Sequence, residues 1–128
     1  MHSGLVFYER GELDKAKEWL EKDFTEKNTA KAAYNLGAVA LKQDDAEQGI
    51  DWFQKSLQLD SQYWDSYMVL GLLYEDIGKI DKAIKILEKG MEQIIDRNEE
   101  GKFFYKDEEK AKKMHSLLKK LERKREKE

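Results

Sequence analysis

The chain has 128 residues, the size of one domain with a single core, and a formal charge of −3 at pH 7. It has no cysteine, which excludes disulfides and thiolate metal sites, and no apolar run long enough to form a transmembrane segment. Charged and apolar residues each make up 40% of the chain, as is typical of amphipathic helices with solvated outer faces. We therefore expect an all-α protein, located in the cytoplasm.

The spacing of apolar residues predicts helices in pairs along the chain. The expected helices cover residues 4–10, 13–24, 29–42, 46–59, 63–76 and 80–97, and a linker at 98–106 leads to a C-terminal helix at 107–128. Gly11, Asp44 and Gly78 fall between paired helices, where a residue in the left-handed conformation commonly ends a helix. Each pair is therefore predicted to form a helical hairpin.

The hairpins are copies of one another, because equivalent residues recur after 33 and then 34 positions. The repeated positions include Gly4, Gly37 and Gly71; Ala16, Gly49 and Ala83; and Leu20, Phe53 and Leu87. Glycine inside a helix costs about 1 kcal/mol relative to alanine. We expect Gly37 and Gly71 to lie against Gly49 and Ala83 of the returning helix, where the two backbones approach closely.

The third hairpin resembles the signature of the tetratricopeptide repeat family, a helical hairpin of about 34 residues. The matching residues are Tyr67, Leu70, Gly71, Tyr74, Ala83 and Leu87. The resemblance implies a right-handed superhelical stack of three helix-turn-helix hairpins, at about residues 1–28, 29–61 and 62–97, in a single domain. The C-terminal helix, apolar on one side and charged elsewhere, would cap the stack.

No group of residues indicates catalysis. The histidines are His2, near the start, and His115, in the basic tail, and neither belongs to a recognisable nucleophile–base arrangement. No spacing indicates a metal site or a phosphate-binding loop. We therefore expect no enzymatic activity, no cofactor, no metal and no small-molecule substrate.

A second stripe of residues on the first helix of each hairpin predicts a binding surface. A helix that packs on one side needs only one such stripe, so the second should line the concave face of the stack as an apolar groove. The predicted groove residues are Leu5, Tyr8, Lys31, Tyr34, Asn35, Ala38, Leu41, Lys42, Asp65, Met68, Leu72 and Glu75. An alternative is that the C-terminal helix fills this surface with Met114, Leu117 and Leu121.

These features favour an adaptor, scaffold or chaperone-like module that binds a protein segment with aliphatic or aromatic anchors. The resemblance also extends to bacterial secretion chaperones of this repeat class, which cradle a translocator segment. Some members of the family hold the C-terminal carboxylate of heat-shock chaperones with lysine, asparagine and arginine. Of that pattern only Asn35 is present, while Leu5, Asp65 and Val69 replace other clamp residues, which argues against this partner.

Two other functions are alternatives. The clipped first hairpin or the groove could receive another copy of the chain, which would make a self-assembling structural protein. Residues 106–128 carry 10 basic and 6 acidic residues and could contact nucleic acid, but the interspersed glutamates weaken this idea. The aromatic stretch KFFY, residues 102–105, is expected to seal the third hairpin and seat the C-terminal helix rather than to serve as an exposed docking element.

Overall fold

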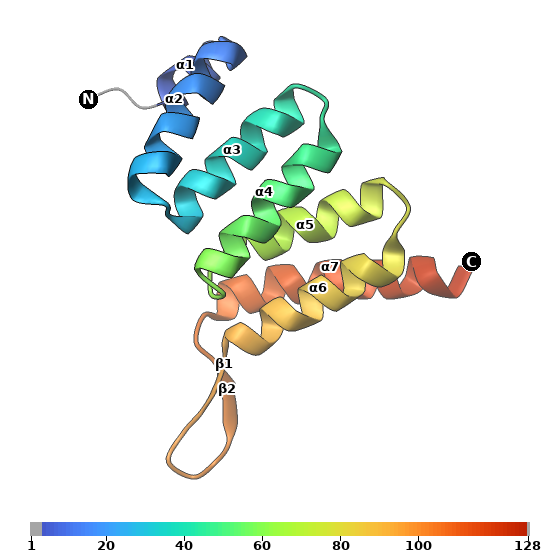
Figure 1. Cartoon of the computed structure of the whole chain (residues 1–128). Helices are drawn as coiled ribbons and strands as arrows, with labels where there is room; N and C mark the ends of the chain where they lie inside the picture. Colours follow the sequence, from blue (N-terminus) through green and yellow to red (C-terminus); the bar gives the residue numbers. More distant parts are fainter. Residues whose placement is uncertain (1–3, 128) are drawn as a thin grey trace. The chain divides into compact units, whose positions relative to one another are not determined.

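A computed structural model describes residues 4–127, with side chains described from Phe7 onward, and its described part is mostly helical (Figure 1). The fold divides into two compact units, Met1–Ser66 and Tyr67–Glu128, and the division falls within one helix. The predicted all-α class is confirmed, as is its construction from helical hairpins.

The first unit contains α1 (Gly4–Glu9), α2 (Leu13–Lys27), α3 (Ala30–Lys42) and α4 (Ala46–Leu59). Its turns and helix starts follow from local chemistry. Gly11 and Asp44 adopt positive φ angles of 77° and 58° between the paired helices, as predicted. The side chain of Thr29 caps α3 by accepting a hydrogen bond from the Ala32 N–H at 3.1 Å. Asp45 caps α4 in the same way.

Small residues allow α3 and α4 to approach closely. A Cβ atom on Gly49 would lie 3.5 Å from the carbonyl oxygen of Gly37, which is the close backbone approach expected from the repeat. A Cβ atom on Gly37 would lie 2.8 Å from the ring of Phe53. The core of this unit continues toward α2 through Ala16, Leu20, Leu36 and Val39, with Phe7, Tyr8, Phe24 and Trp52 packed around it.

The second unit contains most of α5 (Trp64–Asp76), α6 (Ile80–Gln93), β1 (Ile95–Arg97), β2 (Phe103–Tyr105) and α7 (Glu108–Lys127). Gly78, with a φ of 80°, connects α5 to α6. A Cβ atom on Gly71 would lie 2.9 Å from Leu87. The side chain of Leu87 therefore occupies this space, whereas Ala83 was expected there.

The C-terminal helix α7 packs on α6 through one apolar face, as expected for a cap. The buried residues of that face are Ala111, Met114, Leu117, Leu118 and Leu121. Gly90 of α6 leaves room for the side chain of Met114. A Cβ atom on Gly90 would collide with Met114 and would lie 2.8 Å from the ring of Tyr67.

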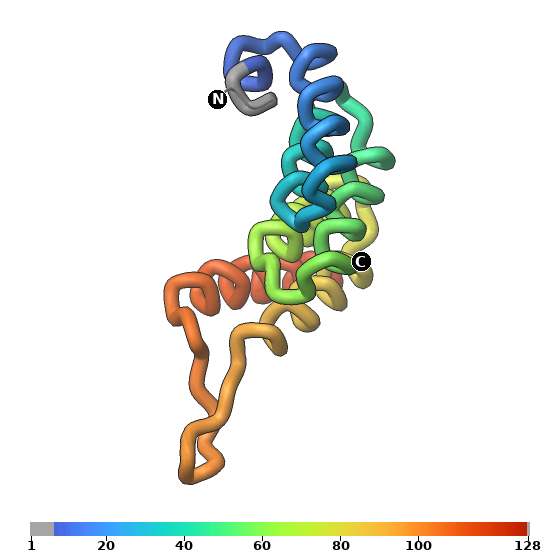
Figure 2. The backbone as a smooth tube through the Cα atoms, turned by 60° about the vertical axis from the view of Figure 1, so that its left-hand side comes forward, coloured from blue at the N-terminus to red at the C-terminus, as the bar shows by residue number. Residues whose placement is uncertain are grey.

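The end of the third hairpin differs from the prediction of a helix over 80–97 followed by an unstructured linker. Helix α6 ends at Gln93, and the chain forms an antiparallel β-hairpin in which Ile95 pairs with Tyr105 and Arg97 with Phe103. Figure 2 shows this hairpin projecting from the ends of α6 and α7. Asn98 explains the turn, because its side-chain oxygen accepts hydrogen bonds from two backbone N–H groups within it.

The prediction that KFFY seals the third hairpin is wrong. Phe103, Phe104 and Tyr105 are 66%, 46% and 43% exposed, and they lie on the second strand of a two-stranded sheet. The guanidinium of Arg97 lies 4.4 Å from the ring centroid of Phe103 and covers part of it.

Candidate functional site

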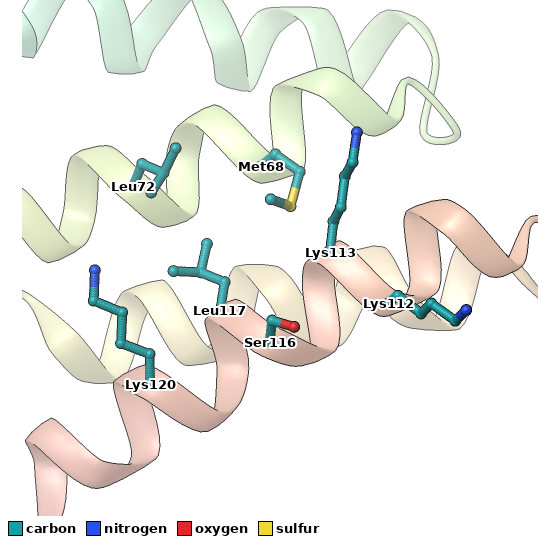
Figure 3. A pocket seen from close by; sticks show the side chains of 7 residues that line it. All are labelled: Met68, Leu72, Lys112, Lys113, Ser116, Leu117 and Lys120. Atoms are coloured by element: carbon teal, nitrogen blue, oxygen red, sulfur yellow. The ribbon is translucent and has the colours of Figure 1, made fainter.

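A groove runs between α5 and α7 within the second unit (Figure 3). It has a volume of about 490 Å³, and two of the predicted groove residues, Met68 and Leu72, form its α5 side. Leu117 faces them from α7. The complete lining is Met68, Leu72, Lys112, Lys113, Ser116, Leu117 and Lys120.

Helical spacing explains why these side chains meet. Met68 and Leu72 are four residues apart in α5 and therefore lie on the same side of the helix. Another side of α5 faces α6, since a Cβ atom on Gly71 would lie 2.9 Å from Leu87, and Leu70 is fully buried. Leu72 remains 48% exposed although α7 lies beside it. The C-terminal helix therefore narrows this surface without filling it.

An ion pair joins α5 to α7, and one of its members, Lys120, also lines the groove. The Glu75 Oε2 atom lies 2.7 Å from the Lys124 ammonium and 3.5 Å from that of Lys120. The Glu75 side chain is only 9% exposed. The hydrogen bond from Lys124 holds the pKa of Glu75 below its ordinary value, with help from the charge of Lys120, although burial acts in the opposite direction. Glu75, predicted to line the groove, thus connects α5 to α7.

Several predicted groove residues of the first unit contact one another or their neighbours within that unit. The ammonium of Lys42, in α3, lies 5.8 Å from the ring centroid of Tyr8, in α1. The ring of Tyr34 packs against Phe53 at 5.3 Å and Tyr63 at 5.7 Å between centroids. Burial raises the pKa of the Tyr34 hydroxyl, and the charge of Asp65 raises it further.

Exposure varies among the remaining predicted residues. Asn35, Ala38 and Leu41 are half-buried, whereas Lys31 and Asp65 are exposed. Leu41 lies close to α4, since a Cβ atom added to Gly49 would lie 3.0 Å from its side chain. The side chain of Leu5 lies outside the described residues.

Sequence reasoning raised the C-terminal helix as an alternative filling of this surface, with Leu117 among its residues, but missed the lysines of that helix. Lys112, Lys113 and Lys120 also line the groove. Lys113, Leu117 and Lys120 follow one another at spacings of four and three, which places them along one side of a helix. That spacing was visible in the sequence, but only the structure shows which helix they face.

Residues 4–127 contain no group of three or more histidine, aspartate or glutamate side chains that could hold a metal ion. No described helix has the length and apolar character needed to span a membrane. The groove offers apolar contact and positive charge, which serve binding rather than bond-making chemistry.

Paired antiparallel helices with small residues at their crossings define a helical-repeat protein. The model of the family described as tetratricopeptide repeat matches residues 28–94, which is more than half of the chain. The chain belongs to the tetratricopeptide repeat family.

Two solved structures of other proteins are similar to this chain. A crystal structure of the MamA protein shares 33% identity and a TM-score of 0.62 over 70% of this chain and 50% of that one. The Yersinia enterocolitica type III secretion chaperone SycD, in complex with a peptide of the translocator YopD, has a TM-score of 0.76 at 15% identity, covering 95% of this chain and 88% of that one. The latter likeness shows the fold alone.

Among curated proteins, the chain is similar to a probable UDP-N-acetylglucosamine–peptide N-acetylglucosaminyltransferase, SPINDLY, from Hordeum vulgare. They are 28% identical over 96 residues, which cover 69% of this chain. The chain spans about 10% of the length of that relative.

Proposed function

We propose that this chain is a non-enzymatic, cytoplasmic protein–protein interaction module that binds a partner segment in the groove between α5 and α7. The single observation that carries the proposal is the groove between α5 and α7, where Met68 and Leu72 present apolar surface and Leu72 is 48% exposed. An apolar surface rimmed by polar groups commonly serves as an interaction site.

Family membership supports this function. The related fold of SycD has been determined with a translocator peptide, and the same architecture in this chain offers a groove for a segment with aliphatic or aromatic anchors. Within the first unit, the half-buried rings of Tyr8 and Tyr34 could supply rigid contact area of their own. An adaptor, scaffold or chaperone-like role is consistent with such a module.

Selection from a random dodecapeptide library tests the proposal. Peptides enriched on the intact chain should bind it and lose at least about tenfold in affinity to Leu72→Glu, because a buried carboxylate replaces apolar contact. Ile77→Glu is the matched control, since Ile77 is 42% exposed and does not line the groove. Peptides that bind both variants equally, or an absence of enriched peptides, would refute binding through this surface.

Light scattering over a range of concentrations tests the alternative of self-assembly. A monomer at every concentration supports the adaptor role. A dimer that the Leu72→Glu substitution dissociates into monomers would mean that the groove binds a second copy of the chain.

A further inference from the structure

A second pocket lies between the end of the β-hairpin and the first turns of α7. It has a volume of about 280 Å³, and its lining is Tyr105, Glu108, Ala111, Lys112 and His115. The four α7 residues are spaced three, one and three apart, which places them along one side of the helix. Small-molecule sites commonly occupy about 300–1,000 Å³, so this pocket is better matched to a single side chain of a partner.

Phe103 is an exposed anchor beside this pocket. It is 66% exposed, more than any other large apolar side chain in the part of the chain that the structure describes. Tyr105, which lines the pocket, is two residues further along β2, so the two side chains project from the same face of the ribbon, about 7 Å apart along the strand. Phe104 lies between them and projects from the opposite face. The pocket and the ring of Phe103 therefore belong to one face of the hairpin, which extends away from the helices (Figure 2).

We infer that this face is an interface between two copies of the chain, in which Phe103 of each copy enters the pocket of the other. A surface that contains both an exposed anchor and a pocket for it is complementary to itself, and a two-fold axis forms both contacts at once. Two-stranded ribbons are marginally stable in water unless another layer packs on them. A second copy would supply that layer, and each pocket would be completed by a residue of the other chain.

The charges beside the anchor and the pocket support a second copy as the occupant. The guanidinium of Arg97 lies 4.4 Å from the ring centroid of Phe103, so it accompanies that ring to the pocket. Glu108 is the acidic residue of the pocket lining. Among the described residues, neither Arg97 nor Glu108 has an ion-pair partner within the chain. Insertion of Phe103 brings the two charges together, and a two-fold axis makes this pair twice.

The rest of the contact is also opposite in charge. The pocket continues along α7 with the basic residue Lys112 and with His115. The hairpin turn beyond Phe103 carries Glu99 and Glu100. The hairpin of one copy and the α7 side of the other therefore match in charge as well as in shape.

Sedimentation equilibrium of the full chain over a range of concentrations tests the inference. The interface is confined to one hairpin and the start of one helix, so we expect a weak, concentration-dependent dimer. Phe103→Ser should raise its dissociation constant at least about tenfold. Phe104→Ser removes the same ring from the opposite face of β2 and should change that constant by less than about twofold. Equal effects of the two variants would overturn the inference.

Exchange of the two charges provides a second test. Arg97→Glu and Glu108→Arg should each weaken the dimer, because each places like charges together at both contacts. An equimolar mixture of the two variants should associate at least about tenfold more tightly than either alone, since opposite charges then meet at both contacts. A mixture without this gain would overturn the inference.

Glu109→Arg is the matched control for the charge exchange. Glu109 is exposed and does not line the pocket, although it is the neighbour of Glu108 in α7. Its mixture with Arg97→Glu should therefore show no gain in association. An equal gain in this control mixture would mean that net charge, rather than the pocket, drives association, and would overturn the inference.

The remaining outcomes separate this inference from the proposed function. A monomer at every concentration up to about 1 mM would overturn the inference, as would a dimer that Leu72→Glu dissociates and Phe103→Ser does not. Phe103→Ser should bind library peptides as the native chain does, because Phe103 does not line the groove between α5 and α7. Peptide binding that is lost in Leu72→Glu and kept in Phe103→Ser supports the proposed function whatever the oligomeric state.

Discussion

Replacement of Glu75 by glutamine removes a charge that joins α5 to α7. Glutamine keeps the size of the side chain and one hydrogen-bond acceptor but loses attraction to Lys124 and Lys120, at 2.7 and 3.5 Å. Buried hydrogen bonds to charged groups contribute about 1.5–3 kcal/mol, and exposed ion pairs about 0–1 kcal/mol. Because the Glu75 side chain is 9% exposed and that of Lys124 49%, we expect a loss of about 1–2 kcal/mol.

Thermal unfolding followed by circular dichroism measures this loss, which corresponds to about 3–8 °C in Tm for a chain of this size. Asp81→Asn is the control, since its pair with Arg125 is exposed and 3.7 Å long and should leave Tm almost unchanged. Equal shifts for the two variants would refute the argument that burial gives Glu75 its effect.

The pH dependence of the Glu75 effect has a definite sign. The pKa of Glu75 is lowered in the folded chain, so its contribution is fully present above the pKa of the unfolded chain. It is lost as the pH falls through the lowered pKa. The difference between the native chain and Glu75→Gln should therefore shrink in acid, and a difference that grows on acidification would contradict the assignment.

Three further substitutions test the packing. Gly71→Ala gains helix propensity, yet its Cβ atom would lie 2.9 Å from Leu87, so we expect a net loss of about 1–2 kcal/mol in denaturant unfolding; unchanged stability would refute close packing there. Gly90→Ala should lower stability and increase hydrogen exchange in α7, because the new methyl group collides with Met114. Unaltered exchange would contradict the close packing of α7 on α6 at Gly90. Phe104→Ser, on the exposed hairpin, should change stability by less than about 0.5 kcal/mol, and a larger loss would show that this ring is packed.

Much of the fold could be predicted from the sequence because the chain repeats the same constraint. The glycines at 37 and 71 recur at one point of the repeat, and each lies where a side chain from the returning helix needs its space. The turn residues Gly11, Asp44 and Gly78 adopt the positive φ angles that their positions predict. Such signals are local or periodic, so a single sequence contains them.

The β-hairpin after α6 was missed because no second copy of it exists to establish a pattern. Ile94 and Ile95 continue the apolar spacing of α6, which extended the predicted helix by several residues. The β-branched pair and the turn formers Asn98 and Gly101 were the available signal. Three neighbouring aromatic residues are commonly buried, yet here a two-stranded ribbon leaves them exposed.

The candidate site could be predicted only in part. Met68 and Leu72 were found from their place on α5, but the lysines opposite them depend on how α7 lies on α5 and α6. Tertiary packing also decides that Glu75 is paired rather than open to a partner. A single sequence does not contain these distances, because they join segments about 40 residues apart whose pairing no repeat establishes.

Amide chemical-shift mapping of the isotope-labelled chain with a peptide enriched from the dodecapeptide library tests most directly whether the groove between α5 and α7 binds a partner segment. The amides of Met68, Leu72 and Leu117 should shift in a saturable manner, and those of the exposed hairpin around Phe104 should not. Saturable shifts centred on the hairpin, or no shifts in α5 and α7, would contradict the account.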